Sequence, residues 1–263
     1  MKTKFIFYLN LFWQMLKTDL IIFKKNIITR FIDTCVWVSM LAFVISYLYP
    51  QLGMAQEFGA FWLVGAIVSS CLFDIEATSA DFVADVEGNK TITYPLTLPI
   101  SSWAVFVKLA LSYACKSAVF AIIIIPLGKL VLWDKLTFTY FDPFKFISIF
   151  LIINLFFGFF SLFMSSLVKK MSNFTKIWVR FFFPMWILGG VMFPWKLIYN
   201  ISPRLAYLFL LNPITYANEG IRATVLSQKD YLPFWLCVPM LCFFGIIFGF
   251  WSIVRLKKQL DFV

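Results

Sequence analysis

LNPITYANEGIRATVL, residues 211–226, is a polar stretch that lies between long apolar runs. Asn212 is a favourable N-cap residue and Pro213 a favourable first helical residue, so we expect a helix to begin here. Glu219 and Arg222 are one helical turn apart and can form an ion pair on that helix. A helix of about 15 residues is roughly 22 Å long, which is too short to cross a bilayer.

The chain around this stretch has the composition of an integral membrane protein. Of its 263 residues, 62% are hydrophobic, 21% are aromatic and only 14% are charged. A water-soluble fold cannot cover that much apolar surface. We therefore expect one transmembrane domain over residues 1–263. The net charge of +10 does not indicate nucleic-acid binding, because the basic residues are distributed along the predicted membrane edges.

The residue types leave little room for reaction chemistry. The sequence has no histidine, and therefore lacks the commonest general base and the commonest transition-metal ligand. Its five cysteines form no C-x-x-C motif and are interpreted as packing residues. The nucleophile motif G-x-S-x-G is also missing, which makes a membrane enzyme a weak alternative. We expect no catalytic residue and no metal site in this chain.

Six segments are long and apolar enough to cross a bilayer as helices. They are residues 29–49, 58–80, 103–127, 146–168, 174–195 and 232–254. The fifth contains Pro184 and the pair Gly189–Gly190, so we expect it to be kinked. The sequence therefore predicts an all-α membrane protein with six transmembrane helices.

Residues 1–26 are expected to form an amphipathic helix that lies in the membrane interface. Apolar residues recur every three or four positions on one face, namely Phe5, Leu9, Phe12, Leu16, Leu20 and Phe23. The opposite face carries Asn10, Gln14, Lys17 and Lys24. A helix with these two faces suits the membrane surface.

The positions of Lys and Arg predict the orientation. The larger basic set flanks span ends on the side that holds both chain ends, so we expect both termini in the cytoplasm. Residues 81–102 are then a cytoplasmic connection, and residues 196–231 an external one. Both are too long to be simple turns.

The external connection is expected to hold a re-entrant helical hairpin between spans five and six. LAYLFLL, residues 205–211, predicts a short apolar helix directly before the helix that begins at Pro213. Irregular backbone at membrane depth persists only where protein or a water-filled cavity surrounds it. Two interpretations stay open, a gate that closes a transport path and a cap that shields the helix ends.

Several charged residues fall inside predicted spans, and Asp74, Lys108 and Lys116 are the candidate intramembrane charges. Asp74 and Lys108 are at the same depth by helical rise, so we expect either an ion pair between them or separate extension to the interface. Lys116 lies near mid-span and should face a path or a polar partner. Arg30 and Asp33 are close enough to the cytoplasmic edge to be anchors.

Three motifs occur in a fixed order along the chain. They are DVEGNKTITYPLTLPISSW at 85–103, GGVMFP at 189–194 and NPITYANEGIR at 212–222. Together with an amphipathic first helix and six spans, these motifs resemble the membrane subunits of type-2 ATP-binding-cassette (ABC-2) exporters. The resemblance covers essentially the whole chain.

The resemblance implies a permease subunit in the inner membrane of a bacterium. Two copies, a homodimer, would enclose a path for an amphiphilic substrate, which is a drug, a lipid or a glycan. Two cytoplasmic ATPase subunits would power transport. ATP and magnesium would bind to those subunits and no cofactor to this chain, which has no G-x-x-x-x-G-K-[ST] motif.

The resemblance also assigns two sets of candidate residues. The connection 81–102 would seat on the ATPases, with coupling residues Asp85, Val86, Glu87, Gly88, Leu98 and Pro99. The hairpin at 205–227 would help to close the external mouth, with gate residues Asn212, Pro213, Glu219 and Arg222.

A secondary carrier or channel that works without an ATPase is the alternative. Six spans without inverted halves are few for a secondary carrier. An adjacent reading frame that encodes a Walker A motif would favour the exporter.

Overall fold

The computed structural model describes residues 2–25, 27–135, 139–168, 170–226 and 228–260. Within these ranges every regular element is a helix and none is a strand. The predicted all-α fold is therefore confirmed. Residues 1 and 26 of the predicted interface helix, and residues 261–263 of the predicted domain, lie outside the described part.

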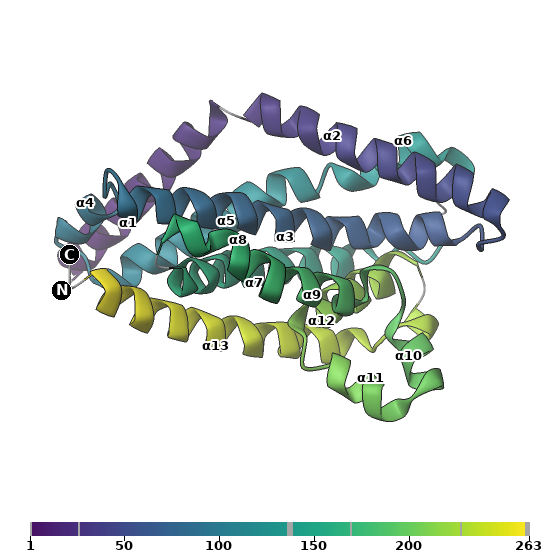
Figure 1. Ribbon diagram of the computed structural model, residues 1–263. Helices are drawn as coiled ribbons and strands as arrows, with labels where there is room; N and C mark the ends of the chain where they lie inside the picture. The colour runs from purple at the N-terminus through teal and green to yellow at the C-terminus, as the bar shows by residue number, and fades with distance from the viewer. Residues whose placement is uncertain (1, 26, 136–138, 169, 227, 261–263) are drawn as a thin grey trace.

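Long helices lie side by side and make up most of the molecule (Figure 1). Six are long and apolar enough to cross a membrane. They are α1 (Lys2–Lys24), α2 (Ile27–Phe43) with its continuation to Leu52, α3 (Phe58–Glu87), α5 (Ser102–Ala121) with α6 (Ile124–Leu132), α7 (Pro143–Leu167) and α13 (Phe234–Leu260). All predicted spans except the fifth correspond to one of these helices.

The fifth predicted span is a broken helix. It consists of α8 (Phe174–Ile177), α9 (Phe183–Trp186) and two wide π-turns, Trp178–Phe182 and Ile187–Val191. Gly190 has the left-handed φ of +78°, which glycine adopts without strain. The chain then bends by 86° into α10 (Trp195–Ile201). The predicted kink is confirmed, and we call this segment, residues 171–191, the broken span.

The core lies between α3 and α7, the two most buried long helices. Among the residues of the apolar stretch of each helix, 83% are buried in α3 and 67% in α7, but only 28% in α13. Phenylalanines of α7 stack on one another and on Phe248 of α13, with centroids 4.7 Å apart for Phe163 and Phe248. These aromatic rings therefore act as packing residues.

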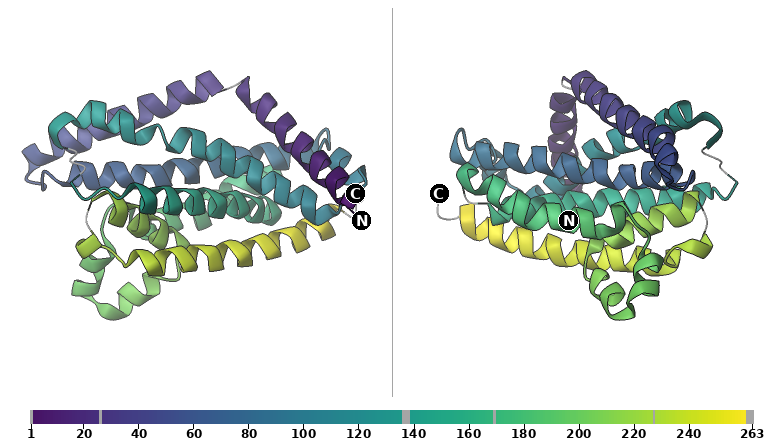
Figure 2. Two further views of the ribbon diagram at one scale, coloured as in Figure 1. Left: turned by 180° about the vertical axis from the view of Figure 1, so that it is seen from behind. Right: turned by 45° about the vertical axis from the view of Figure 1, so that its right-hand side comes forward.

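Helix α1 is inclined to the other helices and crosses one end of them (Figure 2). Only 6% of the residues in its apolar stretch are buried. Leu16 is buried, and Phe23 meets Phe120 of α5 edge to face. Since α1 is also long and apolar enough to cross a membrane, its place in the membrane interface stays a prediction.

Apart from α8 and α9 of the broken span, four shorter helices lie at the two ends of the molecule (Figure 1). Helix α4 (Thr93–Thr97) lies at the end where both termini lie, and we call it the α4 end. Helices α10, α11 (Pro203–Phe209) and α12 (Pro213–Val225) lie at the other end, the α12 end. Helix α10 was not predicted, but the two helices joined at Asn212–Pro213 are confirmed.

The first prediction concerns the two ends. Single cysteines that replace Asn89 at the α4 end and Lys229 at the α12 end, in a cysteine-free background, should react with an impermeant thiol reagent from opposite sides of the membrane. Both positions are exposed, so access decides the result. Labelling of both from outside intact cells would contradict the proposed arrangement.

Candidate functional site

Helix α12 is a polar helix that is buried on all sides. Every residue from Pro213 to Val225 is buried, and Glu219 and Arg222 are 0% exposed. The Asn212 side-chain oxygen accepts a hydrogen bond from the Ile214 N–H at 3.0 Å and caps the helix. The short helix thus has the protein surroundings that irregular structure at membrane depth requires.

Arg222 binds backbone carbonyls from two other segments. Its Nε donates to the Phe61 carbonyl of α3 at 3.1 Å. Its Nη1 and Nη2 donate to the carbonyls of Gly190 and Val191 at 2.5 and 3.0 Å. The last carbonyls of a helix have no partner inside that helix. The fork of donors on Arg222 therefore satisfies the end of the broken span.

Two asparagines extend this pattern along the broken span. The Asn218 side-chain amide donates to the Gly189 carbonyl at 2.8 Å, and that of Asn212 donates to the Met185 carbonyl at 2.6 Å. The GGVMFP motif thus supplies carbonyls, and the NPITYANEGIR motif supplies donors.

Glu219 plays the complementary role for backbone N–H groups beyond the bend. One carboxylate oxygen accepts from the N–H of Trp195, the first residue of α10, at 2.8 Å. The other accepts from the Leu232 N–H at 3.0 Å. The first N–H groups of a helix also lack partners within it. Glu219 and Arg222 together therefore hold both sides of the bend, and we call these two residues with their backbone partners the bend clamp.

The predicted ion pair between Glu219 and Arg222 is wrong. Among the described residues no N–O contact within 4.0 Å joins them, and all their hydrogen bonds go to backbone groups. The bend leaves several buried backbone groups without partners, and unsatisfied groups in a dry interior are costly. The Glu219 carboxylate and the Arg222 guanidinium therefore bind these backbone groups, although their spacing on the helix alone would favour an ion pair between them.

Two glycines allow the close approach of α12. A Cβ on Gly65 of α3 would lie 2.2 Å from Nη2 of Arg222. A Cβ on Gly189 would lie 2.5 Å from Cγ2 of Ile214. Both distances are far below van der Waals contact, so a larger residue at either place would displace α12 or its side chains.

Asp85 shapes the segment at the α4 end. Its carboxylate accepts hydrogen bonds from the N–H groups of Thr91 and Ile92 at 3.0 and 2.9 Å, and from the Thr91 hydroxyl. The tight turn before α4 uses Lys90, whose φ is +53°, and Gly88, whose φ of −102° and ψ of −103° lie outside the helix and strand regions. Asp85 therefore folds the loop back on the end of α3.

The other candidate coupling residues lie around the same turn. The Glu87 carboxylate accepts from the Met171 N–H at 3.1 Å and so joins the segment to the start of the broken span. Val86 and Leu98 are half-buried, and Pro99 is exposed. Between them Tyr94 projects with 70% of its surface exposed. The surface available to a partner at this end is thus centred on α4.

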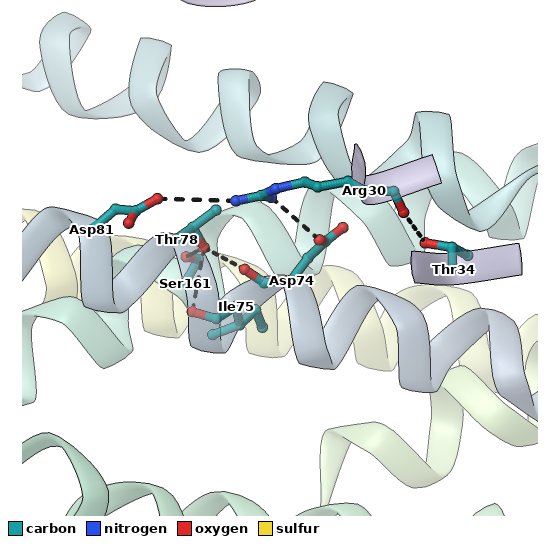
Figure 3. A network of polar contacts seen from close by, with 7 residues as sticks. All are labelled: Arg30, Thr34, Asp74, Ile75, Thr78, Asp81 and Ser161. Carbon is teal, nitrogen blue, oxygen red and sulfur yellow. Dashed lines mark hydrogen bonds and ion pairs between the residues drawn. The ribbon is translucent and has the colours of Figure 1, made fainter. Parts of the chain in front are cut away.

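Arg30 of α2 lies between two carboxylates of α3 (Figure 3). Its guanidinium is 3.6 Å from Asp74 and 4.0 Å from Asp81. Below it, the hydroxyls of Thr78 and Ser161 are 2.9 Å apart. A charge inside a bilayer is stabilised by such partners, so Arg30 joins α2 to α3 and is more than a surface anchor.

The predicted pair between Asp74 and Lys108 is wrong. Asp74 pairs with Arg30, and Lys108 pairs with Asp19 of α1 at 2.8 Å. Lys108 is 3% exposed. Helical rise gives the depth of a residue but not the side of the helix on which it lies. The sequence did contain one indication of the partner of Lys108, because Asp19 is the only acidic residue among residues 1–26.

Lys116 lies beside two aromatic rings, with Nζ 6.0 Å from the Phe23 centroid and 5.7 Å from that of Tyr113. It lines a cavity of about 440 Å³ that is also lined by Lys108 and Asp81. This mid-span cation therefore faces a cavity, bounded mainly by α1, α3 and α5, whose lining mixes charged and apolar side chains.

The second prediction tests the bend clamp. Arg222→Gln should lower the free energy of unfolding by on the order of 3–5 kcal/mol, because three buried carbonyls lose donors and Glu219 loses the nearby charge. Thermal unfolding in detergent measures the change. The control is Arg204→Gln on the exposed surface of α11, which should shift the free energy by less than about 0.5 kcal/mol. Equal changes in the free energy of unfolding for Arg222→Gln and Arg204→Gln would contradict a stabilising role of the bend clamp.

The third prediction concerns close packing. Alanine in place of glycine inside a helix normally stabilises by roughly 0.5–1 kcal/mol. Gly65→Ala should instead destabilise by about 1–3 kcal/mol, because the new methyl group displaces the guanidinium. Gly245→Ala on α13, whose nearest neighbours would be 3.9 Å away, should be neutral or stabilising. If the free energy of unfolding changed in the same direction for both variants, the predicted steric conflict at Gly65 would be contradicted.

Comparison with known proteins agrees with this geometry. The family model described as ABC-2 type transporter matches residues 10–226, a range that includes the segment at the α4 end, the broken span and α12. No curated protein matches the chain. The family match covers most of the 263 residues, and the chain therefore belongs to the ABC-2 type transporter family of multi-pass membrane permeases.

Proposed function

We propose that this chain is the permease subunit of an ATP-driven exporter. Two copies would enclose the path, and two separate cytoplasmic ATPase subunits would bind ATP and magnesium. The α4 end would face the cytoplasm, with both termini, across the plasma membrane of a bacterium. Family membership and the lack of a P-loop motif in the sequence support a division of labour between permease and ATPase.

One observation carries the mechanism. Helix α3 is a single helix of 30 residues, about 45 Å long. At the α12 end its Phe61 carbonyl binds Arg222. At the α4 end Asp85 holds the turn that leads into α4. A displacement of the α4 segment would therefore be transmitted along one stiff, buried rod to the bend clamp.

The broken span would be the element that takes two positions, and the bend clamp would hold it in the position of the present structure. The broken span has two π-turns and a left-handed glycine, and these are weak points in a helix. Helix α12 is bonded to the bend and to α3, so the three would move together. This favours the interpretation of the hairpin as an outer gate over that of a passive cap.

ATP binding would shift this equilibrium only through its different affinity for the two positions. The ATPase would press on the exposed surface around Tyr94. Asp85 and Glu87 would contribute indirectly, because their carboxylates keep the segment folded.

The fourth prediction tests the ATPase interface. Tyr94→Ala should weaken assembly with the ATPase by about tenfold, as loss of a central interface tyrosine commonly does. Membrane insertion and thermal stability should not change. Co-purification from membranes and ATP hydrolysis per reconstituted complex are the measurements. Tyr140→Ala is the matched control, because Tyr140 is 68% exposed, similar to Tyr94, and belongs to the α12 end.

Two results would overturn the proposed function. One is full transport by the purified chain in vesicles without any ATPase, which would identify a secondary carrier or channel. The other is unchanged assembly and ATP hydrolysis in both Tyr94→Ala and charge-reversed Asp85 variants that are correctly inserted.

A further inference from the structure

A second cavity lies between α2 and α3, on the other side of Arg30 from the cavity that Lys116 lines. It has a volume of about 480 Å³, and its walls come from α2, α3 and α5. Pockets of roughly 300–1,000 Å³ bind drug-sized molecules. Helix α2 approaches α3 at the α12 end and diverges from it toward the α4 end (Figures 1 and 2). We call this space the wedge cavity.

The wedge cavity has an excess of negative charge. Three carboxylates line it, from Asp33, Asp74 and Glu76, and Arg30 is the one cation among its described lining residues. Arg30 is shared between Asp74 and Asp81, so its charge is already balanced. Among the described residues, the carboxylates of Asp33 and Glu76 have no ion pair and no hydrogen bond.

Asp74 adds a second, independent observation. One of its oxygens faces Arg30 (Figure 3), but the other, Oδ2, is buried and has no hydrogen-bond partner. A carboxylate within the membrane is costly unless a cation or a donor meets it. The cavity therefore presents the exposed carboxylate of Asp33 and the half-buried one of Glu76, beside an Asp74 carboxylate that Arg30 meets on one side only.

The remaining walls are aromatic. Trp37 of α2 and Phe73 of α3 meet edge to face at 5.5 Å, and Phe120 of α5 also lines the space. Aromatic faces attract cations that are poorly hydrated, such as quaternary onium groups. They also provide the apolar contact that an organic substituent needs. Carboxylates beside aromatic rings therefore fit a cation with lipophilic groups better than an anion or a neutral sugar.

The wedge cavity also touches the broken span through its wall. Phe73 lies 5.5 Å from Trp186 of α9, and the Trp186 indole N–H donates to the Ser69 hydroxyl of α3 at 3.0 Å. Trp186 is five residues before the end of the π-turn that the bend clamp holds. A ligand that moves Phe73 would thus press on the broken span.

We propose that the wedge cavity binds a lipophilic organic cation, an amine or onium compound, and that this is the substrate class of the exporter. The inference rests on the proposed function for the statement that the cation is exported. Binding itself needs only Asp33, Asp74, Glu76 and the aromatic wall.

The fifth prediction uses two ions of the same shape and opposite charge. Tetraphenylphosphonium should bind saturably to the purified chain in nanodiscs of zwitterionic lipid, at least about tenfold more tightly than tetraphenylborate. Empty nanodiscs correct for partition into lipid. This comparison uses the unmodified chain, so it does not depend on whether a variant folds.

A double variant then locates the site. Asp33→Asn with Glu76→Gln should weaken phosphonium binding by about tenfold or more and leave borate binding unchanged or stronger. The matched control is Glu57→Gln with Asp230→Asn, which removes two exposed carboxylates at the α12 end and should change neither. Equal binding of the two ions, or unchanged phosphonium affinity in a folded double variant, would overturn the inference.

Transport assays separate this inference from the proposed function. If the chain binds phosphonium but ATP does not drive its movement in vesicles containing the ATPase, the cation site stands and the export function fails. If ATP drives another solute and phosphonium does not bind, the export function stands and the cation site fails.

Discussion

The hydrogen bonds of the Arg222 guanidinium hold the α12 end together. A helix that bends by 86° with its bend buried in protein has carbonyls and N–H groups that need partners from the protein itself. Arg222 supplies donors to the carbonyls of Gly190 and Val191, and Glu219 supplies acceptors to the N–H groups beyond the bend. The additional bond to Phe61 fixes both to α3. The bend, α12 and α3 are stable only as one unit. Gly65 of α3 and Gly189 of the broken span lie where these segments contact α12.

The two ends of the molecule are built differently, and this difference suits a transporter. At the α12 end, buried charges bind backbone groups and fix the positions of three segments. Toward the α4 end, α2 diverges from α3, and one shared guanidinium, that of Arg30, spans the gap. A structure that is stiff at one end and separable at the other can change the width of the space between its helices without unfolding. In the proposed cycle α3 would carry motion from the divergent end to the bend clamp, and the bend, α12 and α3 would move as one unit.

Sequence reasoning predicted what depends on local pattern. Hydropathy located the long helices, Asn212–Pro213 marked the start of α12, and the glycine pair marked the bend. The partners of the charges were predicted poorly. Asp74 and Lys108 are level, but their partners Arg30 and Asp19 lie on helices whose positions no periodicity reveals. Glu219 and Arg222 have the spacing of a pair, yet the bend creates backbone groups that bind them instead. Helix α10 was missed, although α11 has the same length, because its seven residues include Lys196 and Asn200 and form no continuous apolar run.

The bond between Arg222 and Phe61 also constrains how the protein is made. The two residues are 161 positions apart, so α3 and the broken span enter the membrane before their partner has been synthesised. Until α12 arrives, the carbonyls at the bend need other donors, such as water held at the membrane surface. Of the chain's parts, the α12 end is therefore completed late in biogenesis, with only α13 still to follow. A chain that stalls before residue 222 would expose unsatisfied backbone within the bilayer, a defect by which membrane proteases can distinguish unfinished copies from finished ones.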